Sequence, residues 1–180
     1  MPPRTLHYDR VARALHWTIG SLVIVNILLG ITHDALRGVF QAMFWHQSIG
    51  LTVLALSLVR LGWRLSHPAA PLPEGTAAWE KAAAIGTHWI FYTLMIFMPL
   101  SGWIFTSAGK WPIPFFGLFE VPKFAVTKAD PIVGTLHESH ETLGWIWGAL
   151  VLLHIAAALR HHFILKDGVL LRMWRDAPER

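Results

Sequence analysis

The sequence contains no cysteine. This absence excludes disulfide bonds, thiolate-held iron–sulfur clusters, zinc sites with cysteine ligands and the Cys-x-x-Cys-His attachment of a covalent haem. Any metal or cofactor that the chain binds must therefore be held by other side chains. The eleven histidines, a high number for 180 residues, are the first candidates.

Charged residues are also scarce, at 14% of the chain, whereas a soluble domain carries about a quarter. Four stretches lack Asp, Glu, Lys and Arg altogether, namely residues 14–33, 38–59, 82–109 and 142–159. Each approaches or exceeds the roughly 20 residues that a helix needs to cross a bilayer. The sequence therefore predicts an all-α membrane protein that forms one domain over residues 1–180. The expected four-transmembrane-helix bundle has helices at about 10–33, 38–64, 79–108 and 137–163, which leaves no room for a soluble catalytic domain.

The basic residues indicate how the bundle is oriented. Eleven of the fifteen Lys and Arg lie on the side of the two chain ends, and four lie on the other side: Arg37, Lys110, Lys123 and Lys128. By the positive-inside rule both termini are expected in the cytoplasm. The net charge of +4 thus reflects topology, and we expect a lipid bilayer as partner and no nucleic acid. The first hydrophobic run is longer than a signal-peptide core and has no convincing cleavage site, so it is expected to remain as a helix.

The connections between the helices differ in character. The short segment 34–37 predicts that the first two helices are antiparallel neighbours. Prolines break any helix within 60–81, and Pro99 predicts a kink in the third helix. The segment 110–136 holds four prolines and several aromatic residues, so we expect an apolar cap at the outer end of the bundle or in the interface.

Several histidines lie within or at the ends of the hydrophobic runs, where an ionisable side chain is costly and points to function. His16, His88 and His154 lie in the cytoplasmic halves of their helices, and His46 and His140 lie at the outer ends. Two clusters result, one near each membrane surface. Four histidines at loop, terminal or helix-end positions are interpreted as surface residues: His7, His33, His67 and His137.

The spacing of His140 and His154 is the most informative feature. Fourteen residues bring a helix to within about 40° of whole turns and raise it by about 21 Å, so both imidazoles face the same side at opposite depths. One metal ion cannot bridge that distance. Two flat cofactors, each bound by one of these histidines and by a histidine of a facing helix, fit the core of a four-helix bundle.

Small residues follow the candidate ligands. Each of four histidines has one four positions later on the same helix face, and the pairs are His16 and Gly20, His46 and Gly50, His140 and Gly144, and His154 and Ala158. A small residue there leaves room for a macrocycle. His88 is followed instead by Tyr92, which disfavours it as a ligand, although Ala84 lies on its other side. Small residues are common in membrane helices, so the pattern counts only because it recurs in two depth-matched pairs.

Almost the whole chain resembles the bacterial cytochrome b561 type, a small four-helix di-haem cytochrome related to the membrane subunits of nickel–iron hydrogenases and formate dehydrogenases. The motifs that carry the resemblance are Arg13-Ala-Leu-His16-Trp17, His46-Gln-Ser-Ile-Gly50, Leu58-Val-Arg60-Leu-Gly-Trp-Arg64, His140-Glu-Thr-Leu-Gly144, Leu153-His154-Ile-Ala-Ala and Arg160-His161-His162. The resemblance implies two non-covalent haems b. It assigns His16 and His154 to the cytoplasmic haem, and His46 and His140 to the outer haem, as depth alone suggested.

A haem with two imidazole ligands has no open axial position, so electron transfer is the expected role. Haem propionates need cationic partners. Arg60 and Arg64 lie four residues apart on one helix face and suit the cytoplasmic haem, with Arg13 as a further candidate. The positive-inside rule explains these arginines equally well.

The resemblance further implies ubiquinone as a substrate at one end, and some stand-alone members are similar to enzymes that oxidise periplasmic superoxide. Residues able to bind a quinone or relay protons near the cytoplasmic haem are Lys81, His88, Arg160, His161 and His162. Of these, His161 stands out because it lies seven residues, about two turns, beyond His154. Snorkelling toward lipid headgroups explains the pair His161 and His162 equally well.

The electron donor stays open at this point. Lys110, Lys123 and Lys128 could attract superoxide, but four acidic residues on the same side nearly cancel their charge. The alternative function is that of a haem b membrane anchor, which passes electrons between quinone and a partner dehydrogenase or hydrogenase or a periplasmic cytochrome. The lack of extra helices for docking a large partner favours a stand-alone oxidoreductase. A haem-free transporter is the least favoured class.

Overall fold

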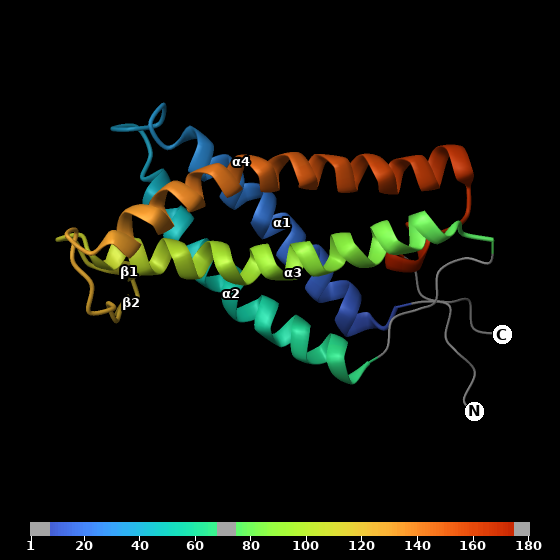
Figure 1. Cartoon of the computed structure of the whole chain (residues 1–180), viewed down its shortest axis with the longest axis horizontal. Helices are drawn as coiled ribbons and strands as arrows, with labels where there is room; N and C mark the ends of the chain where they lie inside the picture. Colours follow the sequence, from blue (N-terminus) through green and yellow to red (C-terminus); the bar gives the residue numbers. More distant parts are fainter. Residues whose placement is uncertain (1–7, 68–74, 175–180) are drawn as a thin grey trace.

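Four long helices dominate the computed structural model, which describes residues 8–67 and 75–174 (Figure 1). Their bounds are Arg10–Thr32 for α1, Ala42–Ser66 for α2, Ala78–Ser107 for α3 and Pro131–Arg160 for α4. α4 continues into a single π-helical turn, His161–Leu165. All four are long and apolar enough to cross a membrane, which confirms the predicted four-helix membrane fold.

Consecutive helices among the described residues run in opposite directions, so that α1 begins at the end of the bundle where α4 ends (Figure 1). A 3₁₀ turn, Leu171–Met173, brings the chain after α4 back onto α1, where the Trp17 indole N–H donates to the Met173 carbonyl at 2.8 Å. We call this end the terminal end. The opposite end carries a small β-hairpin, and we call it the hairpin end.

Two helices start at positions other than those predicted. α4 begins at Pro131 and not at 137. Proline suits the first helical turn, because the backbone N–H groups there make no hydrogen bond within the helix. α2 begins at Ala42 and not at 38, because Gly38 has a φ of +83° and belongs to the turn that precedes the helix. α3 continues through Pro99 without ending.

The hairpin end is closed by the connection between α3 and α4. The strands β1 (Ile113–Phe115) and β2 (Phe119–Val121) pair in antiparallel fashion around a turn in which Phe116 and Gly117 have positive φ. The buried Ser48 hydroxyl of α2 accepts from the Phe116 N–H at 3.0 Å, and its one hydrogen is shared between the Phe44 carbonyl at 3.0 Å and the Pro114 carbonyl at 3.1 Å. The apolar cap expected from the sequence is therefore present, as a hairpin anchored on α2.

A narrow apolar core lies between the helices. It consists of Ile19, Val23, Ile49, Val53, Leu94, Met95, Met98 and Trp147. Trp147 is the one buried residue of α4, whereas α2 and α3 each bury several. Many large apolar side chains lie exposed along the helices, as expected where the surrounding solvent is lipid.

Candidate cofactor-binding site

Two histidine pairs lie inside the bundle, one toward each end. At the terminal end, His16 of α1 faces His154 of α4, with ring centroids 6.2 Å apart and planes at 69°. At the hairpin end, His46 of α2 faces His140 of α4, with centroids 6.0 Å apart and planes at 76°. The structure thus brings together both pairs that the sequence predicted, and α4 contributes one imidazole to each.

α3 supplies an aromatic neighbour to each α4 histidine. The rings of Phe91 and His154 meet edge to face at 5.3 Å, and those of Phe105 and His140 meet edge to face at 5.4 Å. These phenylalanines are fourteen residues apart, as are the two histidines that they contact. Because α3 and α4 run side by side, the matched spacing restrains both imidazoles from one neighbouring helix. Neither phenylalanine was predicted from the sequence, although the spacing between Phe91 and Phe105 equals that between the two histidines.

Hydrogen bonds orient the two imidazoles at the hairpin end. His46 Nδ1 lies 2.9 Å from the Asn26 carbonyl of α1, which can only accept. His140 Nδ1 lies 3.0 Å from the Ser101 hydroxyl, and that hydroxyl already donates its single hydrogen to the Met98 carbonyl at 2.8 Å. His46 therefore carries its hydrogen on Nδ1, and His140 does so too when the Ser101 hydrogen points to Met98. Each therefore keeps the Nε2 lone pair for a metal, which is the arrangement that metal-bound histidines usually adopt.

Glycines of neighbouring helices make room for the same two rings. A Cβ atom on Gly30 of α1 would lie 2.9 Å from His46 Cε1, and one on Gly102 of α3 would lie 3.2 Å from His140 Cε1. The sequence pattern predicted instead the small residues four positions after each histidine on its own helix, namely Gly20, Gly50, Gly144 and Ala158. Of those, a Cβ on Gly50 would approach the Asn26 amide at 3.4 Å, and one on Gly20 would meet open space. The closest approaches come instead from across the helix interfaces, which spacing along one helix cannot reveal.

A cavity of about 430 Å³ opens between the helices at the hairpin end. His46 and His140 line it together with Gly30, Gly102 and the buried Trp147. Two polar atoms at its lining, Asn26 Oδ1 and Trp147 Nε1, are buried without a hydrogen-bond partner. The cavity thus offers two imidazoles, apolar walls and unsatisfied polar atoms to a bound molecule.

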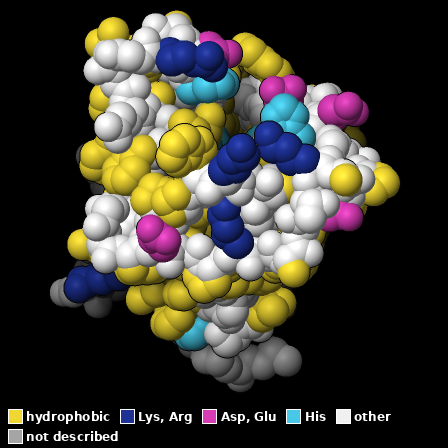
Figure 2. All heavy atoms as spheres, turned by 90° about the vertical axis from the view of Figure 1, so that its left-hand side faces the viewer, with side chains coloured by type: hydrophobic (Ala, Val, Ile, Leu, Met, Phe, Trp, Pro, Cys, Tyr) yellow, Lys and Arg dark blue, Asp and Glu magenta, His cyan; other side chains and the backbone are white. Residues whose placement is uncertain are grey.

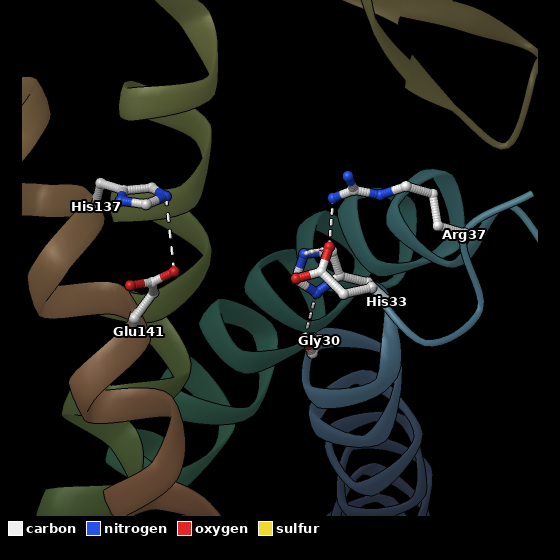
Figure 3. Close-up of polar contacts among 6 residues, drawn as sticks. Gly30, His33, Arg37, His137 and Glu141 are labelled. Atoms are coloured by element: carbon white, nitrogen blue, oxygen red, sulfur yellow. Dashed lines mark hydrogen bonds and ion pairs between the residues drawn. The ribbon is translucent and has the colours of Figure 1, made fainter.

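Polar side chains meet at the hairpin end, and His33, His137 and Glu141 among them line the cavity (Figure 3). His137 Nε2 of α4 lies 3.9 Å from Glu141 Oε1, and His33 Nδ1, just after α1, lies 2.7 Å from the Gly30 carbonyl. The Asp34 carboxylate contacts both the His33 ring and the Arg37 guanidinium. His33 and His137 were interpreted as surface residues; both line the cavity, and His137 has an exposed side chain.

The distance within each pair fits two ligands of one metal. An imidazole nitrogen binds a metal at about 2.0 Å, and the ring centroid lies about 1.2 Å behind it, so opposite imidazoles have centroids about 6.4 Å apart. Within the described ranges 8–67 and 75–174, no group of three or more His, Asp or Glu could hold a metal ion. Haem iron receives most of its ligands from the macrocycle, so two imidazoles are what it needs from a protein. The residues present fit that group.

The three candidate arginines lie at the terminal end with differing surroundings. Arg60 donates to the Ala12 carbonyl at 2.9 Å, and its other terminal nitrogen lies 3.4 Å from His16 Nδ1. Arg64, one turn later, and Arg13 of α1 are half-buried. Arg60 thus lies beside His16 of the terminal-end pair, and its role as a partner of haem propionates stays a prediction.

The predicted quinone residues are spread over two helices at the terminal end. Lys81 and His88 are exposed on α3, and His88 makes no ring contact with either pair among the residues that the structure describes. Arg160 lies 4.0 Å from Glu80 of α3. His161 is half-buried and contacts Asp167 at 2.5 Å, a partner that sequence reasoning missed because it comes from the chain reversal after α4.

Comparisons with known proteins extend over nearly the whole chain. The family described as prokaryotic cytochrome b561 matches residues 7–176. Cytochrome b561 homolog 2 of Escherichia coli (strain K12) is 34% identical, over 92% of this chain and 90% of the relative. The probable superoxide oxidase CybB of Yersinia pestis is 30% identical, over 92% and 94%, and cytochrome b562 of Cereibacter sphaeroides is 31% identical, over 93% and 95%. Together with the four apolar helices, these matches show that the chain belongs to the prokaryotic cytochrome b561 family, multi-pass inner-membrane proteins that bind haem b and transfer electrons across the membrane.

Proposed function

We propose that the chain binds two haems b, one between His16 and His154 and one between His46 and His140. The observation that carries this proposal is that two pairs of imidazoles face each other, with ring centroids 6.2 and 6.0 Å apart. One pair lies toward each end of α4. A haem held by the two histidines of each pair would supply a one-electron carrier. The bundle 1–180 then acts as one domain that conducts electrons from one membrane surface to the other.

The arginines at the terminal end serve the inner cofactor in this proposal. Arg60 already reaches the His16 ring, and Arg13 and Arg64 lie close by on α1 and α2. Guanidinium groups form paired hydrogen bonds with carboxylates, so they suit propionate groups that emerge beside this histidine pair. We place the terminal end in the cytoplasm because most Lys and Arg residues flank it.

The electron donor proposed at the hairpin end is superoxide in the periplasm. The support is a relative named as a probable superoxide oxidase, together with exposed Lys110, Lys123 and Lys128 at this end. Figure 2 looks onto this end and shows Lys and Arg side chains near its middle, beside His and acidic groups. The mixed charge argues for local guidance of a small anion and against a broad basic surface for a large acidic protein.

The proposed acceptor is ubiquinone at the terminal end, where His161, His88 and Lys81 are the candidate residues. Two superoxide ions give up one electron each and become dioxygen. One ubiquinone takes up those two electrons and two protons and becomes ubiquinol. His161 is the foremost candidate for proton delivery because its imidazole is half-buried beyond the His154 pair and contacts the Asp167 carboxylate.

The proposal is tested on the purified protein in detergent. A pyridine haemochrome assay should give two haems per chain, and His140→Ala should remove mainly the hairpin-end haem while His154→Ala removes mainly the other. Superoxide should reduce the bound haem, and a soluble ubiquinone analogue should reoxidise it. One haem or none in the intact protein would overturn the ligand assignment. Two haems that superoxide fails to reduce would favour the alternative function of a membrane anchor for a partner dehydrogenase, hydrogenase or periplasmic cytochrome.

A further inference from the structure

The end of α4 departs from regular helix just beyond the proposed inner haem ligand. Regular α-helical hydrogen bonding ends at Arg160, and the turn His161–Leu165 is π-helical. The chain then reverses through Lys166 and Gly168, whose φ angles of 52° and 76° are both in the left-handed region. A π turn is costly and recurs at functional sites, because it rotates side chains away from the positions that a regular helix would give them.

The reversal brings Asp167 back against His161. His161 Nδ1 lies 2.5 Å from Asp167 Oδ2, and the second carboxylate oxygen accepts the Val169 backbone N–H at 3.1 Å. Burial raises the pKa of Asp167, but hydrogen bonds from His161 and from Val169 outweigh it and hold this pKa below its usual range. The carboxylate is therefore ionised at neutral pH and can only accept from His161 Nδ1. Within the described part of the chain, His161 Nε2 has no hydrogen-bond partner.

The segment that carries Asp167 is held in place from its far side. The Trp17 indole N–H donates to the Met173 carbonyl at 2.8 Å, and the rings of Trp17 and Trp174 meet edge to face at 5.2 Å. Trp17 also contacts the ring of His16, with centroids 5.4 Å apart. The carboxylate is thus positioned by docking of the returning chain on α1, next to the inner histidine pair.

We propose that Asp167 is a positioning residue for His161. The Asp167 carboxylate holds a hydrogen on His161 Nδ1 and so orients His161 Nε2 toward the carbonyl oxygen of a quinone. This inference rests on the proposed quinone site at the terminal end. When the two electrons reduce the quinone, the Nε2–H bond of protonated His161 breaks and an O–H bond forms on one quinone oxygen. Water supplies the proton for the second oxygen and then restores the proton on His161. Asp167 stays ionised throughout and compensates the imidazolium charge before transfer.

The first test is spectroscopic and does not depend on turnover. The reduced holoprotein, labelled with ¹⁵N-histidine, should give a His161 signal pair with Nδ1 protonated and hydrogen-bonded, identified by its loss in His161→Ala. Asp167→Asn should shift that signal pair, because a neutral amide replaces the carboxylate acceptor. Asp9→Asn is the matched control, since Asp9 is a carboxylate at the same end that caps α1 through the Ala12 N–H at 2.8 Å. An unchanged His161 signal in Asp167→Asn would overturn the proposal.

The second test is a double-mutant comparison of haem reoxidation by a soluble ubiquinone analogue. Asp167→Asn should lower the maximal rate by about tenfold with little change in the half-saturating quinone concentration, and Asp9→Asn should change neither. Adding Asp167→Asn to His161→Ala should cause no further slowing, because the carboxylate acts through the imidazole. If the slowing by the two substitutions is additive, or if Asp167→Asn reoxidises normally while His161→Ala is slow, the role of Asp167 is overturned but the quinone site is not. Normal rates in His161→Ala itself would overturn the proposed quinone site, and haem content measured in every variant separates misfolding from both results.

Discussion

Two glycines on neighbouring helices determine how closely the hairpin-end imidazoles approach the bundle. Replacing Gly30 or Gly102 by Ala should lower haem occupancy at this end, because the new Cβ would lie 2.9 Å from His46 Cε1 or 3.2 Å from His140 Cε1. Such overpacking costs about 1–3 kcal/mol, which is enough to reduce affinity by roughly tenfold or more. Gly62→Ala is the control, since nothing lies within 4 Å of its Cβ position. Equal haem content in all three variants would contradict this expectation.

The Ser101 hydroxyl contacts the Nδ1 side of the His140 ring at the hairpin end. Ser101 is 1% exposed and its hydroxyl lies 3.0 Å from His140 Nδ1, so Ser101→Ala should leave the proposed ligand less restrained in orientation. We expect about tenfold weaker haem binding at this end, measured by haem transfer to apomyoglobin. Ser107→Ala is a matched control on the same helix, because Ser107 donates to the Trp103 carbonyl at 2.7 Å and contacts no histidine. Faster haem loss from the control than from Ser101→Ala would count against this role.

At the scale of single elements, α3 supports the α4 histidines through two phenylalanines, and in the proposed assignment it supplies no ligand. Its Phe91 and Phe105 contact those rings, whereas its own histidine, His88, makes no ring contact with either pair among the described residues. His88→Ala should therefore retain both haems and slow reoxidation by a ubiquinone analogue. Loss of a haem in this variant would show that His88 is a ligand, and an unchanged rate would remove it from the quinone site.

Much of this arrangement could be predicted from periodicity and spacing. Fourteen residues between His140 and His154 indicate two ligands on one helix face, and charge-free runs indicate four membrane spans. The partners of these imidazoles could not be predicted, because Gly30, Asn26 and Ser101 reach them across helix interfaces whose register no single-helix pattern contains. Asp167 was missed for a related reason. Its contact with His161 depends on left-handed residues that reverse the chain, and local sequence gives only a turn at Lys166 to Gly168.

The whole molecule has unlike ends, and their charge predicts its orientation in the inner membrane. The terminal end gathers most of the Lys and Arg, so it should lie in the cytoplasm. A reporter enzyme that is active only in the periplasm, fused after Arg180, should therefore give no signal. The same reporter inserted in the exposed connection near Lys128 should be active. A strong signal from the fusion after Arg180 would reverse the proposed direction of electron flow.

α4 occupies an unusual position in the molecule, since it buries only Trp147 in the apolar core yet presents an imidazole to each of two partner helices. If a haem is held at each pair, its coordination would join α4 to α1 and to α2. A cell short of haem would accumulate chains whose fourth span is open to intramembrane proteolysis, so the abundance of the protein would follow the supply of the cofactor.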